Sequence, residues 1–374
     1  MKILHFQSWQ LKNIIKELPK VKEQGFDTIQ ISPVQPYKIE KRNVNGKIEN
    51  RFFWWSVYQP LGFRIGNSLG TEDDLKRLCE AAHELGLKVC VDVVANHTAN
   101  KGGSEEEKLL PHEDVDPVLR DNPNFWKHPN GKTKDGKPAK CVENGEDRED
   151  AVKNAIGLPS LDCNNPDLQK IIGNFIIELH ECGVDGIRWD AAKHIGTPRD
   201  GVSFFPNMSK LLQKLNMFSY AEVLSNNPKN TSWVKEFIDP NLCGLDFVLT
   251  GKEIELDQKK QILYPETHDS LYHEEGEFGF KGSTKHKKQS IIDLQYLKTM
   301  LQKPQANFLY TIRPNPIAIE NFSKSGSDLP NDNDFTNAWE SKFIYFINHY
   351  FGVNEFTIAA SKIKARVMGK WFND

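Results

Sequence analysis

Short runs of apolar and β-branched residues alternate along the chain with segments of helical periodicity. Residues 2–8 and 28–32 have the pattern of strands, and residues 11–24 between them have a helical spacing that stops at Gly25. Residues 71–74 form a capping-box pattern that opens a further helix. The predicted strands are residues 2–8, 28–32, 88–94, 184–189, 218–223, 242–249, 261–266 and 307–312.

These strands and the helical segments between them predict the fold. Repeated strand–helix units produce a parallel sheet, and eight strands favour a closed (β/α)8 TIM barrel over an open doubly wound sheet. A polar stretch at residues 98–160, rich in Gly, Pro, Asn and charge, is too long for an ordinary loop. We therefore predict a barrel of residues 1–97 and 161–350, ending in a helix at 339–350, with a small domain inserted at 98–160 after strand three.

The composition argues against several classes of protein. The 48 Lys and Arg residues nearly balance the 51 Asp and Glu residues, so the net charge of −3 gives no reason to expect a nucleic-acid partner. There is no apolar run of about 18 residues, so no membrane span is predicted. The first residues read as a strand rather than a signal peptide, so a cytoplasmic location is expected. The 6 cysteines lack Cys-x-x-Cys spacing, which predicts free thiols rather than a zinc site.

Ionisable residues follow several predicted strands, at the rim where (β/α)8 enzymes carry their chemistry. These are Asp92, Asn96 and His97 after strand three, Arg188 and Asp190 after strand four, Glu222 after strand five, and Glu266, His268 and Asp269 after strand seven. In residues 186–190, strand alternation places Arg188 and Asp190 on one face and points Trp189 toward the helices. Arg188 keeps Asp190 ionised, and an ionised acid beside a protonatable one is the pairing for glycosidic cleavage.

Each of these residues also has a purely structural interpretation. An acid that closes a strand is often the N-cap of the next helix. A buried Arg188 needs a counter-charge, and Asp92 can supply it. The aromatic residues at 52–58 predict either core packing or a stacking surface for sugar rings. Several acids gathered on one apolar rim nevertheless favour acid–base chemistry, because neighbouring acids split their pKa values.

Four motifs carry a resemblance to a known family. Residues 92–97 (Asp-Val-Val-Ala-Asn-His), 186–194 (Gly-Ile-Arg-Trp-Asp-Ala-Ala-Lys-His), 221–224 (Ala-Glu-Val-Leu) and 266–269 (Glu-Thr-His-Asp) are similar, in this order, to the four conserved regions of the α-amylases, glycoside hydrolase family 13. Shorter segments at 3–5, 32–34, 58–60 and 65–67 are similar to the secreted bacterial α-amylases. The resemblance extends over residues 3–350.

The resemblance implies a retaining mechanism that uses three acids. Asp190 is the expected nucleophile, Glu222 the general acid and then the general base, and Asp269 the acid that holds the 2- and 3-hydroxyls of the sugar. The two main carboxyls are then expected about 5–5.5 Å apart. The residues implied in substrate binding are Tyr58, Gln59, His97, Arg188, Lys193, His194 and His268. The Lys-His pair after the nucleophile favours an endo-acting α-1,4-amylase over an exo-acting glucosidase.

The chain also departs from the family pattern. Asn96 and the carbonyl of His194 are the implied calcium ligands, but Ser160 stands where the family usually places a further acidic ligand. Calcium needs six to eight oxygens, so the resemblance leaves calcium binding open. Thr267 replaces the Asn of chloride-dependent members, so no chloride site is expected, and no organic cofactor is implied. Only residues 351–374 follow the barrel, which predicts a remnant of the family's C-terminal β-sandwich domain.

The predicted function is therefore endohydrolysis of α-1,4-glucosidic bonds in starch, glycogen or maltodextrin by a monomeric enzyme. A transglycosylase or a debranching relative would share all four motifs. A non-catalytic glycan-binding homologue is disfavoured by the intact acids. A metal-dependent lyase on the same barrel would need a cluster of metal ligands at the strand ends.

Overall fold

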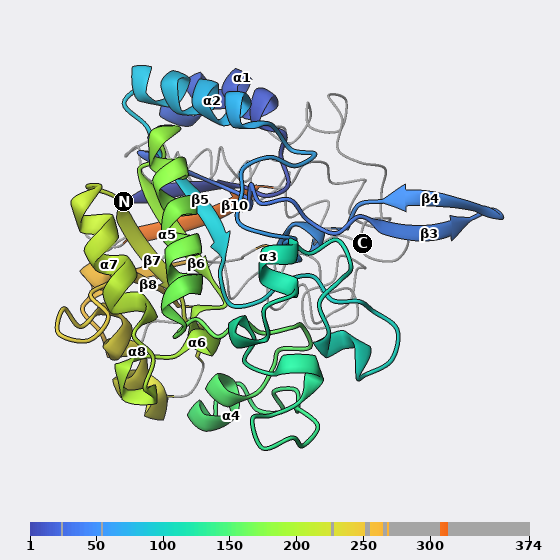
Figure 1. Ribbon diagram of the computed structural model, residues 1–374. Helices are drawn as coiled ribbons and strands as arrows, with labels where there is room; N and C mark the ends of the chain where they lie inside the picture. The colour runs from blue at the N-terminus through green and yellow to red at the C-terminus, as the bar shows by residue number, and fades with distance from the viewer. Residues whose placement is uncertain are drawn as a thin grey trace, which may run out of the picture.

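Parallel strands close into a barrel in the computed structural model (Figure 1), which describes residues 1–264 except 24, 54, 226–227 and 251–254, together with His268 and residues 307–312. The order around the barrel is β1, β10, β9, β8, β7, β6, β5 and β2. The strands are β1 (Lys2–Phe6), β2 (Thr28–Ile31), β5 (Lys88–Val94), β6 (Gly186–Asp190), β7 (Phe218–Glu222), β8 (Phe247–Thr250), β9 (Gln261–Leu263) and β10 (Asn307–Ile312). The predicted (β/α)8 barrel is confirmed. The predicted helix at 339–350 and the remnant at 351–374 lie outside the described residues.

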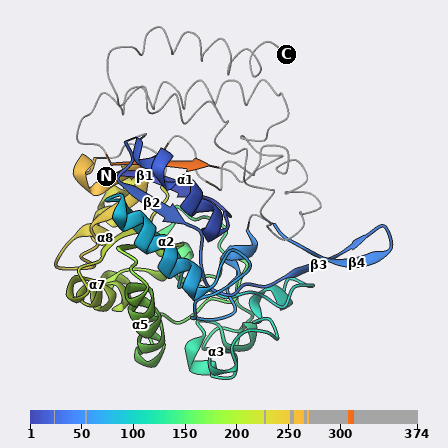
Figure 2. The same ribbon diagram turned by 90° about the horizontal axis from the view of Figure 1, so that it is seen from above.

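Helices cover the outside of the barrel, as Figures 1 and 2 show from two directions. They are α1 (Leu11–Glu23), α2 (Glu72–Glu84), α5 (Pro166–Glu181), α7 (Phe204–Lys214) and α8 (Thr231–Ile238). The predicted capping box begins α2: the Thr71 hydroxyl accepts from the Asp74 amide, and the Asp74 carboxylate accepts from the Thr71 amide. Helix α8 was not predicted from the sequence.

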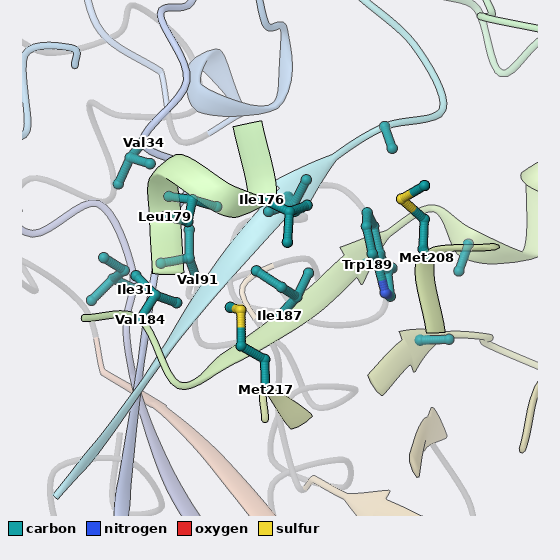
Figure 3. Packing of buried hydrophobic residues seen from close by; sticks show 14 of the residues in the cluster. Ile31, Val34, Val91, Ile176, Leu179, Val184, Ile187, Trp189, Met208 and Met217 are labelled. Carbon is teal, nitrogen blue, oxygen red and sulfur yellow. The ribbon is translucent and has the colours of Figure 1, made fainter. Parts of the chain in front are cut away.

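The main core lies between the strands and these helices (Figure 3). Ile31, Val91 and Ile187 are register partners on three neighbouring strands, and all three are buried beneath α5. Trp189 follows on the same outward face of β6, where its ring packs edge-on against Phe204 at 5.3 Å. The alternation of β6 therefore points Trp189 outward as predicted, and its neighbours Arg188 and Asp190 point into the barrel.

The barrel interior has an apolar layer of its own. It is a separate cluster with one buried side chain from each of six strands: Ile3, Cys90, Tyr220, Leu249, Ile262 and Leu309. Asp92 lies two residues beyond Cys90 on β5, and Glu222 lies two residues beyond Tyr220 on β7. Because alternate residues of a strand share a face, the polar side chains stand directly above this apolar layer.

Two segments interrupt the alternation of strands and helices. Residues 98–160, between β5 and α5, contain only short helices: η2 (Glu107–Leu109), α3 (Pro117–Arg120), η3 (Pro123–Phe125), η4 (Pro129–Gly131) and α4 (Arg148–Lys153). In Figure 1 this segment, coloured teal to green, lies beyond the arrowhead of β5. That it forms a separate domain stays a prediction. We refer to it below as the inserted segment.

The second interruption is an antiparallel hairpin, β3 (Glu40–Val44) and β4 (Lys47–Arg51), which the sequence analysis did not predict. It projects away from the barrel in Figures 1 and 2. Its turn is Asn45-Gly46, with φ of 52° and 83°, the left-handed pair that two-residue hairpin turns require. Strand β4 has no buried position, so the hairpin carries no apolar alternation by which a strand is usually recognised.

Two expectations from composition can be compared with the described part of the chain. All 6 cysteines are free thiols. No helix in the described ranges combines the length and the apolar character that crossing a membrane requires.

Candidate active site

The guanidinium of Arg188 is the centre of the polar cluster at the end of β6. Its Nη1 donates to both carboxylate oxygens of Asp92, at 2.7 and 2.8 Å, and to Oδ1 of Asp190 at 2.8 Å. Its Nη2 forms an ion pair with Oε1 of Glu222 at 2.6 Å. Arg188 is 1% exposed. One buried cation therefore holds three acids that come from three adjacent strands.

The register of the sheet explains why Asp92 and Asp190 both contact Arg188. Asp92 on β5 is the direct partner of Arg188 on β6, so the two side chains share a level inside the barrel. Asp190 lies two residues further along the same face of β6. Burial by itself lowers the pKa of Arg188, but the charges of Asp92, Glu222 and Asp190 outweigh it and carry the pKa above its ordinary value. Arg188 is therefore a permanent positive charge within the barrel.

Asp92 is the acid most affected by this environment. It is fully buried, and burial raises its pKa from 3.8 to about 6, against the opposing effect of Arg188. The hydroxyl of Tyr58 donates to its Oδ2 at 2.9 Å. Asp92 was predicted as a counter-charge for Arg188, and its contact with the guanidinium confirms this.

The backbone after β6 fixes the second oxygen of Glu222. Ala191 has φ 49° and ψ 31°, a left-handed conformation that residues other than glycine rarely adopt. In this conformation the Ala191 amide donates to Oε2 of Glu222 at 2.7 Å. Asp190 and Glu222 are therefore connected twice, through Arg188 and through the amide that follows Asp190. Backbone strain of this kind is often found where a side chain must be held in place for function.

Aromatic and imidazole rings stand beside the acid cluster. The rings of Tyr58 and His268 stack with centroids 4.8 Å apart and an interplanar angle of 5°. His5 meets His268 edge-on at 5.5 Å. Burial lowers the pKa of His268 to about 3 and that of His97 to about 4, so both imidazoles are neutral near pH 7. His5, which the predicted site did not include, is likewise buried with a lowered pKa.

The other predicted substrate-binding residues have protein partners in this structure. His97 Nε2 donates to the Tyr58 carbonyl at 2.9 Å, and Lys193 donates to the carbonyl of Leu224. His194 Nδ1 donates to the carbonyl of Ala151, in the inserted segment, at 2.8 Å. These three side chains connect the loops around the site, and their expected contacts with sugar stay predictions.

Of the remaining residues predicted for the site, the structure describes Gln59 but not Asp269. Gln59 adjoins Tyr58, and its buried Oε1 has no hydrogen-bond partner in the described part of the chain. Asp269, the third expected catalytic acid, lies outside the described residues, as does Glu266. The structure thus brings Asp190, Glu222, Arg188, Tyr58 and His268 together.

The two implied calcium ligands, Asn96 and the His194 carbonyl, do not fit a calcium site in this chain. The His194 carbonyl accepts from the ammonium of Lys127 at 3.0 Å. Asn96 Oδ1, by contrast, is buried without a hydrogen-bond partner among the described residues, so of the two implied ligands it alone has an oxygen open to a cation. Ser160 supplies no carboxylate, and the described ranges contain no group of three or more His, Cys, Asp or Glu that could hold a metal ion. A calcium ion needs six to eight oxygens, and several are usually carboxylates.

Residues 7–341 match the family model of the α-amylase catalytic domain. The chain belongs to the α-amylase family. An α-amylase from Clostridium acetobutylicum is 32% identical over 294 residues, which are 73% of this chain and 36% of that protein. An α-amylase from Butyrivibrio fibrisolvens is 28% identical over 258 residues, 63% of this chain and 25% of that protein. The chain thus spans less than two thirds of the length of these curated α-amylases.

Solved structures of an α-amylase and of a glucanotransferase share the fold. The wild-type α-amylase I from Eisenia fetida has a TM-score of 0.61 and 17% identity, covering 94% of this chain and 78% of that one. CldA, a cyclomaltodextrin glucanotransferase, has a TM-score of 0.59 and 16% identity, covering 94% of this chain and 71% of that one. At these identities the likeness supports the barrel alone, because one fold hosts different reactions.

Proposed function

We propose that the chain is an α-amylase-type glycoside hydrolase that cleaves internal α-1,4-glucosidic bonds of starch, glycogen or maltodextrin with retention of configuration. The observation that carries the proposal is that Arg188 contacts both Asp190 and Glu222 inside the barrel. Curated relatives named α-amylase support the same activity. A cytoplasmic location and a monomeric state stay predictions from the sequence.

In the first step, Asp190 is the nucleophile. Arg188 favours its ionised form through a charge-assisted hydrogen bond, so a carboxylate oxygen is available to attack the anomeric carbon. The bond from that carbon to the glycosidic oxygen breaks as Glu222 gives its proton to the oxygen. The leaving sugar departs with a free hydroxyl, and the other part of the glucan stays bound to Asp190 as an ester.

In the second step, Glu222 is the base. It is now a carboxylate, and both of its oxygens have partners that favour the negative charge, Arg188 and the Ala191 amide. It removes a proton from water while the water oxygen attacks the anomeric carbon, and the ester to Asp190 breaks. Two inversions at one carbon give net retention. If a sugar hydroxyl replaces water in this step, the reaction is transglycosylation.

The proposal is tested by following the chain length of soluble starch over time with purified protein. We expect a fast fall in polymer size with slow release of small sugars. Asp190→Asn abolishes the reaction, because an amide cannot form the ester. Asp73→Asn and Glu149→Gln, at exposed acids on α2 and α4, serve as matched controls and keep full activity.

A second substrate separates the two acids. With an aryl α-maltoside whose leaving group needs no proton, Glu222→Gln keeps bond cleavage, whereas Asp190→Asn does not. Full starch hydrolysis by Asp190→Asn would refute the assignment of the nucleophile. Appearance of longer or cyclic glucans in place of hydrolysis would identify a transglycosylase.

A further inference from the structure

One lysine of the inserted segment is partly buried at its contact with the barrel. Lys127 lies between η3 and η4, and its Nζ donates to the carbonyl of Val152 at 2.8 Å and to that of His194 at 3.0 Å. Val152 belongs to α4 of the inserted segment, whereas His194 belongs to α6 (Ala192–Ile195), directly after β6. One ammonium therefore joins two parts of the inserted segment to the turn that follows Asp190.

The acceptors explain why a cation is needed there. Val152 and His194 both lie in the last turn of a short helix, where carbonyl groups have no partner within the helix. These carbonyls carry the partial negative charge of the helix end. An ammonium has three donors and can bind both at once. Lys127 forms no ion pair with any carboxylate in the described ranges, so its charge is held by neutral oxygens.

The backbone places Lys127 beside the residues expected to bind calcium. The Lys127 amide donates to the Ser160 carbonyl at 2.9 Å, and the Leu161 amide donates to the Asn96 carbonyl at 2.8 Å. His97 and Ser160 form an isolated bridge in the same place. The side chain that occupies the His194 carbonyl thus comes from the segment adjacent to both Ser160 and Asn96.

We propose that the Lys127 ammonium is a built-in structural cation that takes the place of a calcium ion at this junction. It binds the His194 carbonyl, which a calcium ion would otherwise bind, and the missing carboxylate at Ser160 matches a cation of single charge. The protein then keeps its inserted segment docked without a divalent ion. The inference goes beyond the proposed reaction and does not depend on it.

The junction is close to the reacting groups. His194 follows Asp190 by four residues, and the Ala191 amide between them donates to Glu222. Lys193, in the same turn, donates to the Leu224 carbonyl after β7. Burial lowers the pKa of Lys127, and the nearby Cys163 and Asp162 oppose this shift. By holding the β6–α6 turn, Lys127 supports the backbone that positions Glu222.

The first test needs no variant. Protein treated with EDTA and dialysed is unfolded by heat with and without millimolar CaCl2, and CaCl2 is titrated into it by calorimetry. We expect one unfolding midpoint under both conditions and no saturable heat of binding. A saturable heat together with a midpoint raised by calcium would overturn the proposal.

Variants test the lysine itself. Lys127→Met keeps the length of the side chain but removes the charge and the donors, and Lys132→Met changes an exposed lysine of the same segment as a matched control. We expect Lys127→Met to lower the midpoint by about 5 °C or more, as loss of buried contacts does, and Lys132→Met to change it little. Equal midpoints for the two variants would contradict the proposal.

A double variant tests whether the ammonium occupies a cation position. Lys127→Ala with Ser160→Asp removes the ammonium and adds a carboxylate beside the freed His194 carbonyl and Asn96. We expect CaCl2 to raise the unfolding midpoint of this variant and to give a saturable heat of binding. Indifference of this folded variant to calcium would show that the ammonium does not stand in a metal's place. Neither the unfolding midpoint nor the heat of calcium binding depends on glycosidase activity. Failure of the proposed function would therefore be distinguishable from failure of the cation proposal.

Discussion

Two cations of this α-amylase family member, the buried Arg188 and the partly buried Lys127, have opposite surroundings. Arg188, inside the barrel, contacts the carboxylates of Asp92, Asp190 and Glu222. Lys127, in the inserted segment, donates from its ammonium to the carbonyls of Val152 and His194, and the described ranges show no ion pair for it. The first is surrounded by formal negative charge and the second by dipoles.

The different partners of the two cations suit the two sites to different tasks. Around Arg188, acids outnumber the cation, and burial raises the pKa of Asp92 to about 6. Such crowded acids exchange protons and react, which is what glycoside cleavage requires. Around Lys127 the direct partners are carbonyl oxygens, and the acid nearest in effect, Asp162, makes no ion pair with it in the described ranges. The site is therefore suited to holding the chain rather than to acid–base chemistry.

The largest effect is expected from Arg188→Met. This variant leaves the buried Asp92 and Asp190 and the partly buried Glu222 without their counter-charge, which costs about 3–5 kcal/mol of unfolding free energy. It also loses on the order of a thousandfold in kcat/KM, because Asp190 and Glu222 are no longer held in place by the guanidinium. Urea unfolding and starch hydrolysis measure the two losses.

Lys127→Met is the companion to that variant. It leaves two carbonyls unsatisfied, at about 1–3 kcal/mol each, less the gain from no longer burying an ammonium. Its loss of kcat/KM is expected to be far smaller than that of Arg188→Met. Equal losses of kcat/KM in Lys127→Met and Arg188→Met would contradict a purely structural role for Lys127.

The next effect concerns pH and Asp92. Burial raises the pKa of Asp92 to about 6, so protonation below that pH removes one of the charges that hold Arg188. Wild-type kcat/KM should therefore decline as pH falls through 6. Asp92→Asn should lose on the order of tenfold in kcat/KM at pH 7, since Arg188 keeps its other two acids, and should lack that decline. A decline near pH 6 that persists in the Asp92→Asn variant would assign it to another group.

A smaller effect is expected from His268, whose pKa burial lowers from 6.5 to about 3. Between these pH values the unfolded chain binds a proton that the folded chain does not bind, so stability falls as pH falls from 6.5 toward 3. Each pH unit costs about 1.4 kcal/mol from this residue, and His268→Gln removes that contribution. Urea unfolding of both proteins at pH 7 and pH 5 measures it. Parallel declines would show that His268 does not titrate in this way.

The smallest effect is expected from Arg148, a third cation, which joins α4 to the barrel side. It contacts Asp200 at 2.7 Å and Glu236 at 2.8 Å, and its side chain is 32% exposed. Arg148→Met should cost about 1 kcal/mol in dilute buffer and less at about 0.5 M NaCl, because salt screens partly exposed ion pairs. The loss in Lys127→Met should not depend on salt in this way. The same salt dependence in both variants would show that Lys127 stabilises the protein through ion pairs rather than through carbonyl contacts.

Much of the barrel could be predicted because its strands carry the pattern of the core. In β6, Ile187 and Trp189 must face the helices, so Arg188 and Asp190 must face inward. The hairpin of β3 and β4 was missed although its Asn45-Gly46 turn is a known signal. Its strands are charged and solvated, so no apolar periodicity marks them.

The site could be predicted in part for the same reason. The acids Asp190 and Glu222 close apolar strands, and strand ends on one rim converge. Lys127 could not be predicted, because a lysine in the polar stretch of residues 98–160 reads as a surface residue. Its partners are main-chain carbonyls, which carry no signature of residue type. Only the folded turns of α4 and α6 bring those carbonyls to one ammonium.

The most direct test of the proposed mechanism is the configuration of the first sugar released from maltodextrin, followed by proton NMR before mutarotation. Asp190 and Glu222, held by one guanidinium, predict double displacement, and the first product is then the α-anomer. Initial release of the β-anomer would mean that water attacks in a single displacement. That result would contradict both Asp190 as the nucleophile and the catalytic role of the acids around Arg188.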